Sequence, residues 1–414
     1  MTPEAEDAAH AAATRVARES YGKLVAFLAA RDRDIASAED VLSDALAAAL
    51  AEWPRRGVPA NPEGWLIVTA RRRKIDAMRR GRVADEASQT LRLVAEELQA
   101  AEDAGPLPDR RLALMFVCAH PAIDEAVRAP LMLQTILGLD AAAIASAFLV
   151  SPATMGQRLS RAKAKIRLAG APFRIPEREE LPERLDAVLE AIYAAFAYGW
   201  EQAFADDPRG RNLAEEAIWL GRLIAALAFD EPEALGLLAL MLYADSRRAA
   251  RRDDAGRYAP LAEQDVSRWN LAAIDEAELL LRTASAKTRP GRFQLEAAIQ
   301  SAHAARRHGG ATDWPAIAAL YDALYALTGS KVVAVNRAVA SAEAYGEARG
   351  LALLDAVAAE GALETYQSYW AARAALCARA GRKEEAADAY RHAIGLEFDP
   401  ATRAFLIDRL AELG

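Results

Sequence analysis

The chain has 414 residues, of which 53% are hydrophobic and 27% charged, and its formal net charge is −8. This composition excludes a disordered chain, and the length indicates roughly two or three domains. No apolar run of about 18 residues is present and the first residues lack an apolar signal core, so we expect no membrane span and a cytoplasmic location.

Alanine is abundant while β-branched and aromatic residues are sparse, which predicts an all-α protein. Cys118 and Cys377 are far apart and the histidines lack ligand spacing, so we expect no disulfide framework, no metal site and no cofactor. We find no Ser-His-Asp set, no phosphate-binding glycine loop and no paired carboxylates. The chain is therefore not expected to be an enzyme.

Residues 14–82 are expected to form three or four helices, and the second of these carries acidic residues. Ser37 and Asp40 are predicted to form a capping box at its start. Leu42, Leu46, Ala49 and Trp53 follow at helical spacing and are expected to be buried. Asp44 has no capping role, which favours a basic partner surface.

The segment 61–80 predicts a strongly basic amphipathic helix. From Arg71 to Arg82 there are seven cations and one acid. Such a helix can bind a nucleic-acid backbone, but it can equally dock on a membrane or a partner protein. Trp65 at its start is expected to be a core residue rather than a stacking platform for bases.

Residues 83–108 are polar and end in Gly-Pro-Leu-Pro, so they predict a linker. Residues 109–170 predict short helices that end in a helix-turn-helix. Its first helix follows Asp140 as cap, with Ile144 and Phe148 on one face. Cys118 and His120, earlier in this segment, are expected to be core and turn residues.

The second helix of this pair, from Ser151 to Arg167, contains five cations and no acid. Ser151 is a favourable N-cap and Pro152 a favourable first residue. An apolar stripe at spacings of four, three and four predicts one buried face: Met155, Leu159, Ala162 and Ile166. The exposed cations favour insertion into a DNA major groove, although a solvated basic face is the alternative.

Residues 181–414 predict a series of amphipathic helices. Trp370, Gly381, Ala386, Tyr390 and Ala393 match the small and aromatic positions of a tetratricopeptide repeat, and an irregular bundle is the alternative.

Within this series, residues 245–265 predict a surface loop. We expect its arginines 247, 248, 251 and 252 to pair with Asp253 and Asp254. His303 and His308 are expected to be surface or capping residues.

The order of an acidic helix, a Trp-bearing basic helix, a linker and a helix-turn-helix resembles bacterial RNA polymerase sigma factors of the extracytoplasmic-function group. "SAEDVLSDALAAAL" resembles region 2.2, "GWLIVTARRRKIDAMRR" regions 2.3–2.4, and "RLSRA" the run typical of region 4.2. Residues 181–414 resemble the tetratricopeptide-like extension of one subgroup. The sequence departs from the pattern at Ser43, at Ala45-Leu46 and at Gly156.

The resemblance implies a sigma factor that binds core RNA polymerase and promoter DNA, regulated by its extension. It implies region 2 at 14–82, region 4 at 109–170, and the extension at 181–414. The residues implied to bind the β′ clamp helices are Glu39, Asp40 and Asp44. Those implied at the −10 element are Trp65, Arg71, Arg72, Arg73, Lys74, Arg79 and Arg80. Those implied at the −35 element are Ser151, Thr154, Gln157, Arg158, Arg161, Lys163 and Lys165.

Two questions stay open at the sequence level. A helix-turn-helix regulator with a helical-repeat sensor would need the basic helix but not the acidic one, and a repeat scaffold would need neither. The extension could inhibit or support the sigma domains, and we expect support. By analogy with the subgroup, a small YCII-like protein is a candidate partner.

Overall fold

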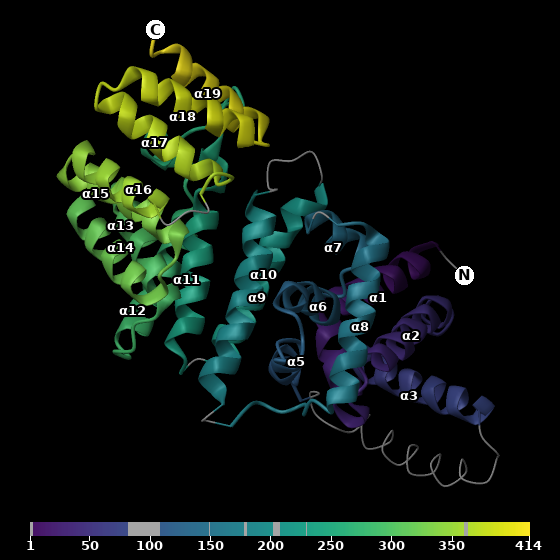
Figure 1. The fold of residues 1–414 in the computed structure, drawn as a ribbon. Helices are drawn as coiled ribbons and strands as arrows, with labels where there is room; N and C mark the ends of the chain where they lie inside the picture. Colours follow the sequence, from purple (N-terminus) through teal and green to yellow (C-terminus); the bar gives the residue numbers. More distant parts are fainter. Residues whose placement is uncertain are drawn as a thin grey trace. The chain divides into compact units, whose positions relative to one another are not determined.

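The computed structural model describes residues 3–81, 108–148, 150–177, 180–201, 208–228, 230–359 and 363–414. Within these ranges the chain is helical without a strand, and an isolated bridge joins Arg252 to Tyr258 (Figure 1). The all-α prediction is confirmed. The chain forms two compact units, Met1–Ala217 and Ile218–Gly414. The predicted linker 83–108 lies almost wholly outside the described residues.

The N-terminal unit is organised around its first helix, which packs against α2, α3, α5 and α6. Gly22 of this helix permits the contact with α6, because a Cβ there would lie 2.3 Å from the Ile136 carbonyl oxygen. The helices are α1 (Pro3–Asp32), α2 (Ile35–Arg56), α3 (Pro62–Gly81), α5 (Arg111–Cys118), α6 (Glu125–Leu137), α7 (Ala141–Ala147), α8 (Pro152–Ala169) and α9 (Leu181–Glu201), and the boundary between the units falls inside α10 (Pro208–Leu227).

Helices α5 and α6 supply much of the core of this unit. Cys118 is fully buried, as the sequence predicts, and burial raises the pKa of its thiol to about 12. His120 lies in the turn between the two helices. Helix α9 packs on both, and the Arg184 guanidinium donates a hydrogen bond to the Phe116 carbonyl. In the structure α9 therefore belongs to the N-terminal unit.

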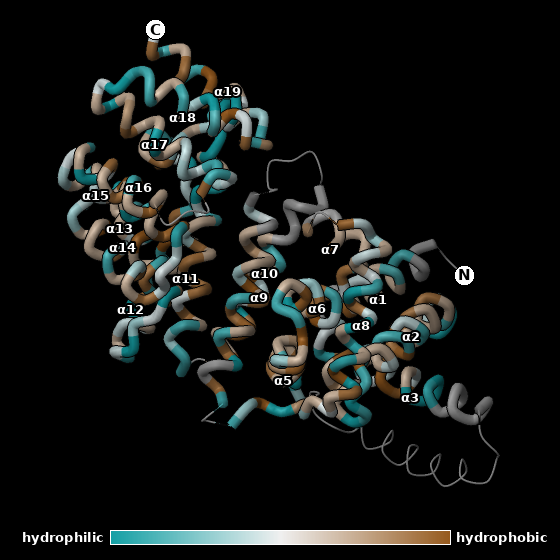
Figure 2. The backbone as a smooth tube through the Cα atoms, in the orientation of Figure 1, coloured by the Kyte–Doolittle hydropathy of each residue, from teal (hydrophilic) through white to brown (hydrophobic). Residues whose placement is uncertain are grey.

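The C-terminal unit consists of helices that pack against their neighbours in sequence, with α11 against α12 and α13, α14 against α15, and α17 against α18. Figure 2 shows hydrophobic and hydrophilic residues interspersed along the helices, as amphipathic packing requires. The helices are α11 (Pro232–Ser246), α12 (Leu271–Ser285), α13 (Arg292–Ala304), α14 (Trp314–Thr328), α15 (Lys331–Tyr345), α16 (Glu347–Ala359), α17 (Gln367–Arg379), α18 (Lys383–Leu396) and α19 (Pro400–Ala411).

The connection from α11 to α12, residues 247–270, contains three short 3-10 helices, η2 (Arg248–Arg251), η3 (Leu261–Glu263) and η4 (Val266–Arg268). The ion pairs of this connection differ in part from the predicted pairing of its first arginines with Asp253 and Asp254. Asp253 pairs with Arg257 and Asp254 with Arg268, whereas Arg248 pairs with Asp245 and Arg252 with Asp399. The turn at Gly256 directs the two aspartates to later arginines.

A further 3-10 helix, η5 (Ala305–His308), extends α13. His303 at the end of α13 is buried, so its predicted surface position is wrong. Its ring packs edge-on against Trp314, with ring centroids 5.4 Å apart. The contact with Trp314, 11 positions later in the chain, explains why His303 is buried. His308 is exposed.

Candidate nucleic-acid and polymerase interface

Helix α8 has the start and the buried face that its sequence predicts. The Ser151 hydroxyl accepts a hydrogen bond from the Thr154 backbone nitrogen at 3.1 Å, and Pro152 occupies the first turn. Met155, Leu159 and Ala162, with Ile166, are buried. The preceding helix α7 begins after Asp140, whose carboxylate accepts from the Ala143 nitrogen at 2.7 Å.

Most of the side chains proposed to read DNA project from the opposite face of α8 into solvent. A helix fixed along one side presents its other side at helical spacing, which is the geometry required for insertion into a major groove. The exposed members of the predicted set are Ser151, Thr154, Gln157, Arg158, Arg161 and Lys165.

Lys163 differs from the other predicted DNA contacts. Its side chain is only 11% exposed, and its ammonium forms an ion pair with the Glu39 carboxylate, which is 14% exposed. Glu39 lies on α2, in the set predicted to bind polymerase. Burial raises the pKa of Glu39 despite the opposing effect of Lys163, and Oε1 of Glu39 has no hydrogen-bond partner.

Two weaker contacts extend this junction between α2 and α8. The Arg167 guanidinium lies 3.4 Å from the Asp34 carboxylate, and Arg33 Nη1 donates to the Gly170 carbonyl at 3.4 Å. The α2–α8 junction therefore joins the acidic helix to the basic helix. In this arrangement Lys163 and Glu39 pair with each other instead of facing external partners.

The start of α2 differs from the predicted capping box. The N-cap is Asp34, whose carboxylate accepts from the Ser37 backbone nitrogen at 3.1 Å. Asp40 lies more than a turn inside the helix and, like Asp44, is exposed. Capping therefore explains neither Asp40 nor Asp44, and both carboxylates remain on the surface.

Helix α3 contains the predicted −10 set. Trp65 is half-buried and meets Trp53 edge-to-face with ring centroids 5.5 Å apart, which agrees with a structural role. The Arg71 guanidinium lies 5.3 Å from the centroid of the Phe27 ring, and Lys74 pairs with Asp32. Arg72 and Arg73 are exposed, whereas the side chains of Arg79 and Arg80 lie outside the described residues.

A network that the sequence did not reveal fixes the first turn of α3 to α1. The Glu63 carboxylate accepts hydrogen bonds from Ser20 at 2.5 Å and from Lys23 at 2.8 Å. Burial acts to raise the pKa of Glu63, but these hydrogen bonds outweigh it and the pKa is lowered. Glu63 lies 40 or more positions from Ser20 and from Lys23, so no local pattern signals these contacts.

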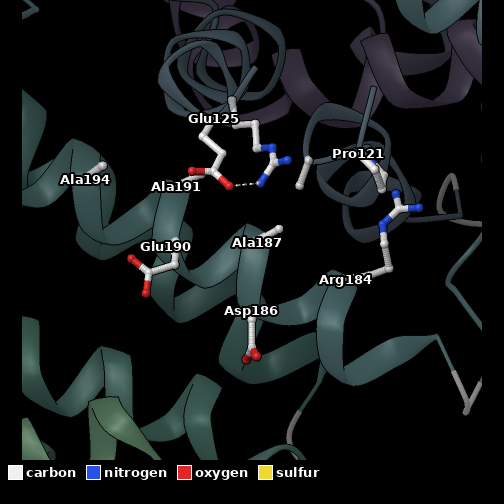
Figure 3. Close-up of a pocket in the computed structure, with 10 residues that line it drawn as sticks. Pro121, Glu125, Arg184, Asp186, Ala187, Glu190, Ala191 and Ala194 are labelled. Carbon is white, nitrogen blue, oxygen red and sulfur yellow. Dashed lines mark ion pairs between the residues drawn. The ribbon is translucent and has the colours of Figure 1, made fainter. Parts of the chain in front are cut away.

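A cavity of about 490 Å³ opens between the α5–α6 turn and α9 (Figure 3). Arg184 points toward Pro121, and Glu125 forms an ion pair with Arg128 at 3.8 Å. Burial, with Arg184 and Arg128 nearby, lowers the pKa of His120. The lining holds three carboxylates, of Glu125, Asp186 and Glu190, beside the two arginines, so it carries no excess of positive charge.

No described helix combines the length and the apolarity needed to cross a membrane. The described part of the chain also holds no group of three or more histidine, cysteine or acidic residues that could bind a metal ion.

Comparisons with known proteins place these surfaces in context. Residues 4–83, which include α1 to α3, match the family model of Sigma-70 region 2. A protein of Rhizobium meliloti (strain 1021), described as uncharacterized, is 37% identical over 387 residues, which cover 92% of this chain and 91% of the relative. The chain belongs to the family of this Rhizobium protein. Residues 184–285 of the chain match the model of a family of unknown function, DUF6596. No solved structure matches the chain.

The segment of the chain that matches Sigma-70 region 2 contains the acidic face of α2 and the basic face of α3. This domain implies binding to core RNA polymerase and to promoter DNA, and it indicates a sigma-factor role in transcription initiation. Sigma factors are not a class of enzymes.

Proposed function

We propose that the protein is a sigma factor of the extracytoplasmic-function group that directs core RNA polymerase to its promoters. The observation that carries the proposal is the match of α1–α3 to Sigma-70 region 2. On these helices exposed acids on α2, Asp40 and Asp44, accompany exposed cations on α3, Arg72 and Arg73. Separate acidic and basic faces suit one domain that binds a protein and DNA together.

Helices α7 and α8 act in this proposal as the helix-turn-helix that contacts the −35 element. Gln157, Arg158 and Arg161 are exposed along one side of a helix whose other side is buried, which supports the assignment. Arginine and glutamine side chains can hydrogen-bond base edges in the major groove, and lysines bind phosphates. The remaining members of the set position the helix on the DNA backbone.

The α2–α8 junction gives this sigma factor a closed form. Glu39 and Lys163 are assigned to different partners, yet here they form one ion pair. For Glu39 to meet polymerase and Lys163 to meet DNA, the junction must open, and the two binding events then share one conformational step. Polymerase and DNA would each favour the open form, because polymerase binds the exposed Glu39 and DNA binds the exposed Lys163.

The C-terminal unit acts as a tetratricopeptide-like extension that supports the sigma domains. Trp370, Ala386, Tyr390 and Ala393 pack between α17 and its neighbours, which suits a repeat. Support rather than inhibition is our proposal, because a large folded extension can fix the spacing of the promoter-binding domains. A small YCII-like protein is the proposed partner of this unit.

Reconstituted transcription tests the main proposal. Core RNA polymerase is mixed with the full-length protein and a library of genomic fragments, and the transcripts are sequenced. A sigma factor yields transcripts with defined starts without any other sigma factor. Transcription that appears only when another sigma factor is added indicates a helix-turn-helix regulator instead, and no effect in either assay indicates a scaffold.

Truncation tests the role of the extension. A fragment that ends after Glu201 keeps α9 on α5 and α6, whereas a fragment that ends after Glu177 removes this packing. We expect the longer fragment to transcribe less than the full-length protein at equal folded concentration. An increase would instead indicate an inhibitory extension, and an unchanged rate would exclude direct regulation by it.

A further inference from the structure

Arg247 is a buried cation in the C-terminal unit with no acidic partner. It follows α11 directly and is only 8% exposed. Its Nη2 donates a hydrogen bond to Oε1 of Gln300, and its Nη1 has no hydrogen-bond partner. None of the described carboxylates forms an ion pair with it. A buried guanidinium remains charged, so this arrangement is costly unless another group supplies negative charge.

The groups around Arg247 add positive charge instead of removing it. Burial first, and then the charges of Arg251 and Arg306, lower the pKa of Arg247 to about 10. Burial together with Arg247 and Arg306 also lowers the pKa of His303 to about 4, so this imidazole is neutral at pH 7. The hydroxyl of Tyr321 is a further titratable group close to Arg247, and the Glu296 carboxylate acts on Tyr321 in turn.

Arg306 is held rigidly beside this site. Its Nη2 donates to the Ala262 carbonyl at 3.0 Å, its Nη1 donates to the Leu261 carbonyl, and its guanidinium lies 5.6 Å from the centroid of the Trp269 ring. These neutral partners occupy its donors without cancelling its charge. Arg306 therefore contributes a fixed positive field.

The buried side-chain atoms of the 247–270 connection without a hydrogen-bond partner also include Nε1 of Trp269 and Oε1 of Gln264. The Asn270 nitrogen donates to the Ser246 carbonyl at 2.8 Å, which brings the two ends of the connection together and places Trp269 near Arg247. Buried polar groups are nearly always satisfied in folded proteins. Two unsatisfied donors, on Arg247 and Trp269, therefore lie in one cationic region.

We propose that Arg247, Trp269 and Arg306, the Arg247 cluster, bind a small oxyanion. Nη1 of Arg247 and Nε1 of Trp269 donate hydrogen bonds to its oxygens, and Arg306 adds charge. A water molecule could accept the same hydrogen bonds, but it would leave the positive charge uncompensated. The burial of the cluster limits the ligand to the size of a phosphate or a carboxylate group. The extension of this protein is in that case a ligand-binding domain.

Thermal unfolding of the full-length protein tests the proposal. Inorganic phosphate and acetate are titrated separately in the low millimolar range, with sodium chloride holding the ionic strength constant. We expect the melting temperature of the C-terminal unit to rise by about 2–4 °C near five times the dissociation constant, and to keep rising with the logarithm of the anion concentration. A response to phosphate alone identifies a phosphate site, and a response to both anions identifies a general oxyanion site.

Two variants separate binding at the cluster from general salt effects. Arg247→Met removes the buried charge at similar side-chain length and should abolish the response. Without anion it should melt no lower than the wild type, because an uncompensated charge has been removed. Arg257→Met changes an arginine in the same connection that is 78% exposed and paired with Asp253, and it should respond like the wild type.

Isothermal titration of phosphate and acetate into the wild-type protein provides a measurement that does not depend on the folding of either variant. Saturable heat should appear for the wild type and for Arg257→Met. The proposal is overturned if neither anion produces saturable heat or a shift in melting temperature, which would mean that water alone occupies the site. An equal response in folded Arg247→Met would overturn it as well.

Discussion

Lys163 in the N-terminal unit and Arg247 in the C-terminal unit are both cations that the fold removes from water, but their surroundings differ. Lys163 faces the Glu39 carboxylate across the α2–α8 junction. Arg247 faces Gln300 and further cations. The first charge is neutralised within the chain, while the second is not.

This difference separates two uses of a buried charge. A paired charge fixes the relative position of two elements, because each side chain left alone would be poorly solvated. An unpaired charge leaves an interaction for a ligand to complete. The measurements below test whether Lys163 is mainly structural and whether the positive charges around Arg247 keep the buried His303 neutral.

The largest effect is expected from Lys163→Met, which leaves Glu39 buried without a partner. Breaking a buried ion pair in this way costs about 3–5 kcal/mol of unfolding free energy. Urea unfolding of the N-terminal unit measures the loss. The double variant with Glu39→Leu should recover most of it, and additive losses in the two single variants would mean that the residues do not interact.

The second effect is a loss of stability in acid that depends on His303. Its pKa of about 4 in the folded protein lies below the ordinary value of 6.5, so the unfolded chain binds more protons between these values. The stabilisation of the folded protein that depends on neutral His303 is fully present above pH 6.5. It is lost as the pH falls toward 4, and the free energy of unfolding falls by about 3 kcal/mol at most. Unfolding of His303→Gln across this range should depend less on pH. His308→Gln, a change at an exposed histidine nearby, should behave like the wild type.

The third effect concerns DNA binding without loss of stability. Arg161 is exposed on the same helix as Lys163, so Arg161→Ala should leave the unfolding free energy nearly unchanged. If it contacts a base, promoter binding should weaken by about 1–3 kcal/mol and one −35 position should become less specific. If it contacts a phosphate, the slope of binding against salt should fall by about one. Unchanged affinity and selectivity at all salt concentrations would remove Arg161 from the interface.

The smallest effect is expected at Asp44, because a single exposed charge pair contributes little. Asp44→Arg should weaken binding to core polymerase by about five- to tenfold, roughly 1 kcal/mol, while the helical content stays constant. Glu52→Arg makes the same charge change two turns later on α2 and serves as the control. Equal affinity of both variants and the wild type would mean that Asp44 lies outside the polymerase interface.

Local features were predictable from the sequence where neighbouring residues determine them. The cap at Ser151 and the buried stripe of α8 depend on spacings of three or four residues, and both predictions are confirmed. The cap of α2 was predicted at Ser37, three residues too late. Asp34 is also a favourable capping residue, and it is the N-cap in the structure.

Contacts between distant segments were not predictable in this way. Glu39 and Lys163 are 124 positions apart, and neither has a local feature that identifies the other. His303 was expected on the surface because its burial depends on Trp314 and on the arginines near it after folding. The arginine run at 247–252 was assigned to the nearest acids, although Arg252 pairs with an acid 147 positions away.

That pair between Arg252 and Asp399 also determines when the extension can be completed during synthesis. Asp399 caps α19 and accepts two hydrogen bonds from Arg252, at 2.7 and 2.8 Å, while Arg409 on α19 pairs with Glu263 at 2.8 Å. The 247–270 connection is thus held by residues 146 and 147 positions later in the chain. A nascent chain that lacks α19 would carry this connection only partly anchored, so these contacts form only once α19 has been synthesised.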